Sequence, residues 1–150
     1  MIGITYRRLL ERDVAGIAQV HRRACLIAYR FMNWSYSEDA VREWYACKFA
    51  GWDWGLVATE KTTVVGFVAT EGSHVDQLFV DPDYQKHGIG TSMLAAALGR
   101  MPALVTLTVF EANMRARRFY ESHGFREAGS FFNESDRSVE LVYRRDGNSS

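Results

Sequence analysis

The sequence predicts a mixed α+β domain in which about seven strands form a central sheet and about four helices flank it. Short β-prone segments alternate with helical patterns along 150 residues, and this length suits one compact domain. A strand, a tight turn and a helix that opens on two glycines follow one another near the middle of the chain. Strands and helices then alternate as a βαβα unit in the second half, which predicts sheet and helices packed in layers.

The first half is predicted to contain one strand, two helices and a hairpin. Residues 2–8 alternate enough to be the opening strand. Asp13 is expected to cap a first helix, and Ser37 to cap a second. The first helix carries positions along one face: Val14, Ile17, His21, Ala24 and Ala28. Residues 56–60 and 63–70 are expected to pair as an antiparallel hairpin.

A third strand over residues 74–80 ends where Pro82 cannot donate to a ladder. Its core residues Val75, Leu78 and Val80 are spaced by three and then two, which breaks strict alternation. One extra residue near Asp76 and Gln77 would return all three to one face, as a β-bulge. The alternative is that Val75 faces the other side of a doubly covered sheet. A bulge would leave backbone groups free to hold an extended ligand that carries amides.

The second half completes the domain. Residues 88–101 show the clearest helical spacing, and residues 104–110 form a β-prone run expected of a strand covered on both faces. A helix over residues 113–122 can end at Gly124. Two last strands, 126–132 and 139–144, flank a polar turn. Residues 1–145 are therefore predicted as a single domain, and residues 146–150 as a flexible tail.

Composition excludes several classes of function. Lys+Arg and Asp+Glu both total 18, so no general electrostatic attraction to nucleic acid or to an anionic membrane is expected. Residues 1–8 lack the apolar run of a signal peptide, and no segment is long enough to span a membrane. A cytoplasmic protein is the expectation. Cys25 and Cys47 follow no metal-ligand spacing, so no metal is expected, and both are interpreted as buried free thiols.

The segment Gln85-Lys86-His87-Gly88-Ile89-Gly90 has the features of an anion site. A helix N-terminus presents unpaired N–H groups, glycines allow close approach, and Lys86 and His87 could add positive charge. The Walker pattern fails because Thr91 follows Gly90, and the dinucleotide pattern fails because Met93 stands where a small residue is needed.

Two motifs in the right order resemble those of the GNAT superfamily of N-acetyltransferases. Gln85, Gly88 and Gly90 match the family's Gln/Arg-X-X-Gly-X-Gly/Ala, and the preceding strand with its bulge also resembles the family's central strand. Residues 113–125 resemble the family's Asn-X-X-Ala-X-X-Phe-Tyr-X-X-X-Gly-Phe block. The resemblance implies a mostly antiparallel sheet that splays between the third strand and residues 104–110. It also implies N-acetyl transfer from acetyl-CoA or a related acyl-CoA.

The resemblance further implies which residues bind the cofactor. Backbone groups of the third strand would pair with the pantetheine arm, the loop amides would hold the pyrophosphate, and the later block would pack against the pantetheine end. These positions are Leu78, Phe79, Val80, Gln85, Lys86, His87, Gly88, Ile89, Gly90, Thr91, Asn113, Ala116, Phe119 and Tyr120.

The family match also implies that Tyr120 protonates or hydrogen-bonds the thiolate that leaves, because a phenol near the sulfur can do so. From the residue alone, a core aromatic is the simpler interpretation. A general base must deprotonate the acceptor amine, and Asp76 at the bulge is placed first. His74, Glu71 or a water molecule are the alternatives, and a hydrogen bond to a neighbouring loop is the structural alternative for Asp76.

The resemblance implies that the first two helices and their connection form much of the acceptor wall. The acceptor is expected to be a cationic amine, because aromatic side chains gather there in this sequence. These are Tyr29, Phe31, Trp34, Tyr36, Trp44 and Tyr45, with Trp52 and Trp54 following and Glu38, Asp39 and Asp53 nearby. Core or dimer contacts are the equal alternative. A small-molecule amine is placed first, and a peptide N-terminus or lysine second. A non-catalytic acyl-CoA-binding domain is the rival function, and a homodimer stays open because the family often dimerises.

Overall fold

The computed structural model describes residues 3–29 and 36–147 of the chain. The strands are β1 (Ile4–Arg8), β2 (Trp54–Glu60), β3 (Thr63–Glu71), β4 (His74–Val80), β5 (Leu104–Phe110), β6 (Arg126–Asn133) and β7 (Ser138–Asp146). The helices are α1 (Val14–Ala28), α2 (Glu38–Phe49), α3 (Ile89–Leu98) and α4 (Met114–Ser122), with short 3-10 turns η1 (Glu11–Asp13) and η3 (Pro82–Tyr84). The mixed α+β class and the order of its elements are confirmed.

The seven strands form one sheet in the order β1-β2-β3-β4-β5-β7-β6. All neighbouring pairs are antiparallel except β4 and β5, which are parallel and share the single register pair His74↔Thr106. The two strands therefore separate beyond this pair, and the sheet opens into a wedge. This is the mostly antiparallel, splayed sheet that the resemblance implied.

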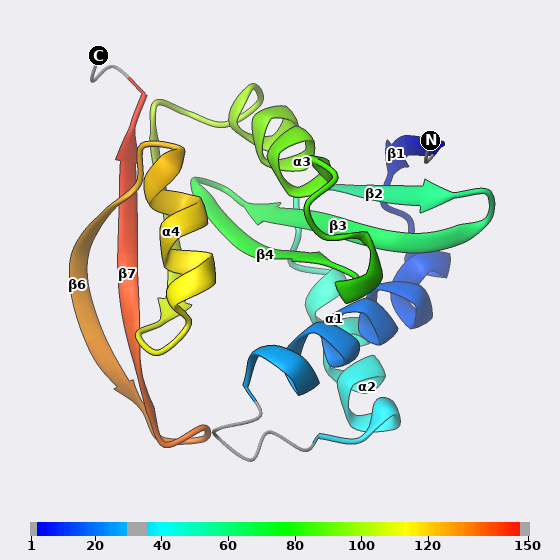
Figure 1. The fold of residues 1–150 in the computed structure, drawn as a ribbon, viewed down its shortest axis with the longest axis horizontal. Helices are drawn as coiled ribbons and strands as arrows, with labels where there is room; N and C mark the ends of the chain where they lie inside the picture. Colours follow the sequence, from blue (N-terminus) through cyan, green and yellow to red (C-terminus); the bar gives the residue numbers. More distant parts are fainter. Residues whose placement is uncertain (1–2, 30–35, 148–150) are drawn as a thin grey trace.

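Helices cover both faces of the sheet (Figure 1). Helix α3 lies on one face of β2–β4, and α1 and α2 lie on the other. Met93 and Leu94 of α3 pack with Val68 of β3, while Ile17 of α1 and Tyr45 of α2 pack with Phe67. Burying these two apolar faces supplies the main stabilisation of the layers.

Helix α4 covers the other half of the sheet. Tyr120 packs in the same core cluster as Leu107 of β5 and Leu141 of β7. Arg117 fixes the helix further, because its Nε donates to the Tyr143 hydroxyl at 3.1 Å and its Nη1 donates to the Glu111 carbonyl at 2.9 Å. Each half of the wedge thus carries its own helix on this face.

Several boundaries differ from the sequence prediction for local reasons. Asp13 stands at the start of α1 but makes no capping bond there, because its carboxylate accepts from the Arg7 guanidinium and from the Leu10 amide at 2.8 Å. Helix α3 ends at Leu98: the Gly99 amide still bonds to the Ala95 carbonyl, four residues back, but the amides of Arg100 and Met101 bond three residues back. Ser37 does cap α2, accepting from the Ala40 amide at 3.1 Å.

The ends of the described chain and the cysteines also differ in part. Strand β7 continues to Asp146, and the Gly147 amide donates to the Ala103 carbonyl at 2.7 Å; residues 148–150 of the expected tail lie outside the described residues. Cys25 is buried, whereas Cys47 is exposed on the solvent side of α2. The prediction of a buried thiol is wrong for Cys47, because the buried residues of α2 are Val41 and Tyr45. No helix within the described ranges is long and apolar enough to cross a membrane.

Candidate functional site

The open edge of β4 is the first component of the site. Ala69 pairs with Gln77 and Thr70 pairs with Val75, so Asp76 is an extra residue in β4. The predicted bulge is confirmed, and it places Val75, Leu78 and Val80 on the same core face. Beyond His74, β4 has no register partner in β5. Its backbone groups on that side are therefore available to an extended ligand.

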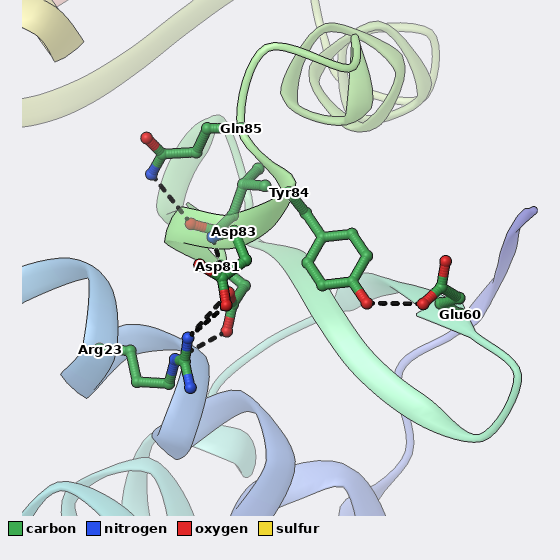
Figure 2. Close-up of polar contacts among 7 residues, drawn as sticks. Arg23, Glu60, Asp81, Asp83, Tyr84 and Gln85 are labelled. Carbon is green, nitrogen blue, oxygen red and sulfur yellow. Dashed lines mark hydrogen bonds and ion pairs between the residues drawn. The ribbon is translucent and has the colours of Figure 1, made fainter. Parts of the chain in front are cut away.

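The segment after β4 is held from three directions (Figure 2). Arg23 of α1 forms ion pairs with Asp81 at 3.0 Å and with Asp83 at 2.9 Å. The Tyr84 hydroxyl donates to Glu60 of β2 at 2.6 Å, and Gln85 Nε2 donates to the Val80 carbonyl at 3.1 Å. These contacts fix the approach to the glycine-rich loop, and Gln85 folds the loop back over the end of β4.

The loop itself has the backbone of an anion-binding turn. Lys86 and Gly88 adopt positive φ angles of 69° and 78°, and successive turns of this kind point amides into a concavity. The Ser92 amide is the first in α3 to bond within the helix, to the Gly88 carbonyl at 3.0 Å. The amides of Ile89, Gly90 and Thr91 therefore lack helical acceptors and lie at the positive end of the helix dipole.

A cavity of about 610 Å³, called the loop cavity below, lies between this loop, β4, α1 and α4. Of the described side chains that line it, two are the cations Lys86 and Arg115, and none is Asp or Glu. Thirteen of the fourteen residues expected to bind the cofactor line it: Leu78, Phe79, Val80, Gln85, Lys86, Gly88, Ile89, Gly90, Thr91, Asn113, Ala116, Phe119 and Tyr120. His87 is outside this lining. Residues that the resemblance assigned to the cofactor, up to about forty positions apart in the sequence, thus line one concavity.

A second cavity of about 630 Å³, called the acidic cavity below, is lined by residues 75–79 of β4 and by residues of α1, α2, β5 and the β6–β7 hairpin. Among the residues that the structure describes, its lining contains three carboxylates, Asp76, Asp136 and Glu140, and no Lys or Arg. Its single imidazole, His21, has its pKa lowered to about 4 by burial, so this group is neutral at pH 7. The cavity is therefore electronegative, in contrast to the loop cavity.

The two cavities meet at five shared lining residues, which are Leu78, Phe79, Asn113, Ala116 and Tyr120. This set is called the junction below. Tyr120 is 8% exposed, and burial raises the pKa of its phenol. Its hydroxyl makes no hydrogen bond to another described residue. No fully buried side-chain nitrogen or oxygen among the described residues lacks a partner, so this hydroxyl is a protonated group that is accessible from the cavities that Tyr120 lines.

The two residues expected as bases lie in different surroundings. Asp76 lines the acidic cavity, where its Oδ2 accepts from Trp52 Nε1 at 2.8 Å and is paired with Lys48 Nζ at 3.1 Å. His74 lies at the closed end of the wedge, with Nδ1 at 2.9 Å from the Thr106 hydroxyl, and lines neither cavity. The geometry favours Asp76 over His74 as the group that an acceptor could reach.

The predicted aromatic wall is placed only in part. Tyr29, Tyr36 and Trp44 line the acidic cavity, whereas Trp54 is in the core of the sheet. Phe31 and Trp34 lie outside the described residues. The carboxylates expected nearby are elsewhere: Asp39 pairs with Arg42, and Asp53 accepts from the Thr70 hydroxyl and the Gly72 amide.

Sequence reasoning missed His21, Asp136 and Glu140. His21, Cys25 and Tyr29 are spaced by four residues along α1 and all face the acidic cavity. Ala24 and Ala28, on the adjacent stripe, face the loop cavity. The sequence signal that could have identified His21 was a polar residue among the apolar positions along one face of α1. No local signal marks Asp136 or Glu140, since only the folded hairpin brings them to α1. Within the described ranges, no group of three or more His, Cys, Asp or Glu side chains could hold a metal ion.

Comparison with known proteins agrees with this arrangement. The family model of the acetyltransferase (GNAT) domain matches residues 35–137. The peptidyl-lysine N-acetyltransferase YjaB of Salmonella typhimurium is 39% identical over 129 residues, which cover 84% of this chain and 86% of that protein.

Solved structures have the same fold. The solution structure of apo-form YjaB from Escherichia coli gives a TM-score of 0.78 at 24% identity, covering 95% of this chain and 97% of that chain. The crystal structure of PaiA N-acetyltransferase from Thermoplasma acidophilum in complex with coenzyme A gives a TM-score of 0.74 at 19% identity, covering 97% and 99% of the two chains.

Proposed function

Because this chain belongs to the GNAT family of N-acetyltransferases, we propose that it transfers an acetyl group from acetyl-CoA to the side-chain amine of lysine in a protein or peptide. The observation that carries the proposal is the opposite charge of two connected cavities. Within the described ranges, the loop cavity is lined by cations without carboxylates, and the acidic cavity by carboxylates without Lys or Arg. One suits a polyanionic donor and the other a cationic acceptor, and their junction is the place where the two would meet.

The residues of the loop cavity fit coenzyme A. The free amides of Ile89, Gly90 and Thr91 and the charge of Lys86 suit a pyrophosphate. The unpaired edge of β4 suits the amides of a pantetheine arm, which would lie as an extra strand in the wedge. Asn113 and Ala116 would contact the end of that arm at the junction. Acetyl-CoA, when bound, supplies a thioester whose carbonyl carbon an amine attacks and whose thiolate leaves.

Tyr120 is proposed as the proton donor to the leaving group. Its phenol stays protonated because burial raises its pKa, and its hydroxyl makes no hydrogen bond to another described residue. A donor placed at the junction can stabilise negative charge that develops on sulfur.

Asp76 is proposed to receive the proton that the ammonium must lose. A carboxylate offers about four lone-pair positions, and the contacts with Trp52 and Lys48 leave some of them for an incoming ammonium or a bridging water. The bulge turns Asp76 out of the ladder and into the acidic cavity. His74 is not assigned a role, because its imidazole lines neither cavity.

Asp136 and Glu140 are proposed to attract the acceptor's charge. Each carboxylate is oriented by a neighbour: the Tyr36 hydroxyl donates to Asp136 at 3.1 Å, and Asn133 Nδ2 donates to Glu140 at 2.6 Å. The sequence placed a small amine ahead of lysine in a peptide. The relatives named as peptidyl-lysine acetyltransferases favour the second, so lysine in a peptide is the acceptor proposed here.

The test is release of free CoA from acetyl-CoA with matched acceptors. Peptides with a blocked N-terminus and one internal lysine are compared with the same peptides carrying arginine, with free lysine, and with small amines. We expect turnover with the lysine peptides and none with the arginine peptides. Turnover with small amines alone would overturn the peptide acceptor. Failure of CoA to bind in competition with ATP and NAD would overturn the proposed donor.

A further inference from the structure

The wide end of the wedge needs contacts that hold its two halves together, because β4 and β5 share one register pair at the narrow end. Tyr29 supplies such a contact. It follows the last residue of α1, where its amide donates to the Cys25 carbonyl at 2.9 Å. Asn113 Nδ2 donates to the Tyr29 hydroxyl at 2.9 Å across 84 positions of sequence. The bond joins the first helix of one half to the start of α4 in the other.

The side-chain amide of Asn113 is held by one hydrogen bond at its oxygen and one at its nitrogen. Its Oδ1 accepts from the Ala116 amide at 3.1 Å, which caps α4. This bond requires the oxygen to face the helix, so the nitrogen faces Tyr29. Rotation about χ2 would place the NH₂ group against the Ala116 N–H and leave both without an acceptor. The Ala116 N–H therefore determines which end of the Asn113 amide faces the helix, and the Tyr29 oxygen holds the other end in place at the junction.

Tyr29 is itself held rigidly. It is 5% exposed, and its ring meets that of Phe110 at 4.9 Å and 72° in an edge-to-face contact. Burial raises the pKa of its phenol, so the oxygen accepts from Asn113 as a neutral hydroxyl over the physiological range. Two χ angles fixed by packing hold this oxygen in place.

From this geometry we propose that Tyr29 is a positioning residue, whose hydroxyl orients the Asn113 amide toward the acyl end of the bound donor. The proposal deepens the function proposed above and rests on it. Asn113 Nδ2 carries two hydrogens, and one is donated to Tyr29. The other is then directed along a defined line at the junction, where it can reach a carbonyl of the pantetheine end. Tyr29 acts through Asn113 and is assigned no contact with the donor.

The test is a double-mutant cycle on CoA affinity, with Tyr29→Phe, Asn113→Ser and both together. Serine keeps a side-chain oxygen that can cap α4, so the helix is retained while the amide is removed. We expect Tyr29→Phe to raise the CoA Kd by about tenfold, the usual size of one lost buried hydrogen bond. It should have no further effect in the Asn113→Ser background, because the two residues act as one unit. Independent effects that multiply would overturn the proposal, as would an unchanged Kd in Tyr29→Phe.

Controls separate this role from a general loss of structure. Tyr45→Phe removes an equally buried hydroxyl, which contacts His21 and Gln77 rather than Asn113, and should leave the CoA Kd unchanged. In the wild-type protein the Asn113 side-chain amide should be rigid by NMR relaxation, with an order parameter near about 0.85, and a value below about 0.6 would contradict the proposal without any mutation. A wild-type protein that fails to bind CoA would instead refute the proposed function.

Discussion

At the scale of single residues, burial governs the protonation of three titratable groups that line the acidic cavity. The pKa values of Tyr29 and Tyr120 are raised and that of His21 is lowered, so each group is held in its neutral form. In each case burial is the largest cause. The lining of the acidic cavity therefore holds two kinds of polar group: neutral hydrogen-bonding side chains and carboxylates, with Asp76 on β4 and Asp136 and Glu140 on the hairpin. This division suits a site that attracts a cation and must then convert it to a neutral amine.

Tyr120→Phe tests the proton donor. The change removes one oxygen and keeps the ring that packs against Phe119 and Phe125. We expect kcat to fall by about a hundredfold or more, the lower end of what general acids contribute, with the CoA Kd unchanged by calorimetry. Because the pKa of the phenol is raised, no loss of activity from its ionisation is expected below about pH 10. Wild-type turnover in the variant would exclude this role for Tyr120.

His21 predicts a pH dependence of stability. Its pKa is about 4 in the folded protein against 6.5 in an exposed chain, so the unfolded state binds more protons between these values. Stability contributed by neutral His21 is present above pH 6.5 and is lost as the pH falls toward 4. At pH 5 the loss is about 2 kcal/mol. Urea unfolding at pH 7 and pH 5 should show this difference, and His21→Gln should lack that part of it. An equal pH dependence in both proteins would contradict the prediction.

The identity of a residue was predictable where the local backbone conformation alone requires it. The glycines of the loop are fixed by local geometry, and Gly88 has the positive φ angle that such a turn requires. The place of Asp136 and Glu140 in the acidic cavity was not predictable, because it depends on a hairpin meeting α1 and α2 far along the chain. The residue type of Asp13 suggested a helix cap, but its carboxylate binds the Arg7 guanidinium instead.

At the scale of elements, α1 contributes to both cavities through adjacent stripes and also holds the loop. Arg23 reaches the turn before the loop, and Tyr29 reaches the start of α4. The bulge in β4 was predictable because three apolar positions with spacings of three and two can share one face only with an extra residue. The end of α3 was not predictable from the sequence. Gly99 and the two residues after it continue the chain as a tight turn, and their composition does not differ clearly from that of the helix.

The glycine loop predicts a contrast between two similar substitutions. Gly88 has a φ of 78° with open space around it, so alanine there is strained by backbone conformation alone. At Gly90 φ is not positive, and an added Cβ would make ordinary contacts, the nearest at 3.5 Å to Phe119. We expect Gly88→Ala to lose about 1 kcal/mol of unfolding free energy and to bind CoA more weakly. Gly90→Ala should remain close to wild type in urea unfolding. Equal unfolding midpoints for the two variants would refute the conformational argument.

At the scale of the whole molecule, the fold is a sheet of two parts that meet at one narrow end. The β1–β4 part carries α1, α2 and α3, and the β5–β7 part carries α4. Side chains bridge the open end, among them Tyr29–Asn113 and Tyr36–Asp136. A donor bound in the wedge would replace the missing ladder between β4 and β5, so binding and the joining of the two parts are the same event.

Hydrogen exchange can follow that event directly. Peptides that cover residues 75–81 and 85–92 contain the unpaired edge of β4 and the free amides of α3, and both should exchange slowly once acetyl-CoA is present at about 100 times its Kd. Strand β6 provides a matched control, because it is also an edge strand and is exposed along most of its length. Residues 126–132 of β6 should keep their exchange rate, since they line neither cavity.

Binding at that excess stabilises the folded state by about 2.7 kcal/mol, which would slow exchange everywhere that requires global unfolding. Protection of the β4 and loop peptides must therefore exceed that of the core strands β2 and β3 if the donor pairs with the wedge. Protection that is uniform over the chain would show that the donor stabilises the fold without lying against β4.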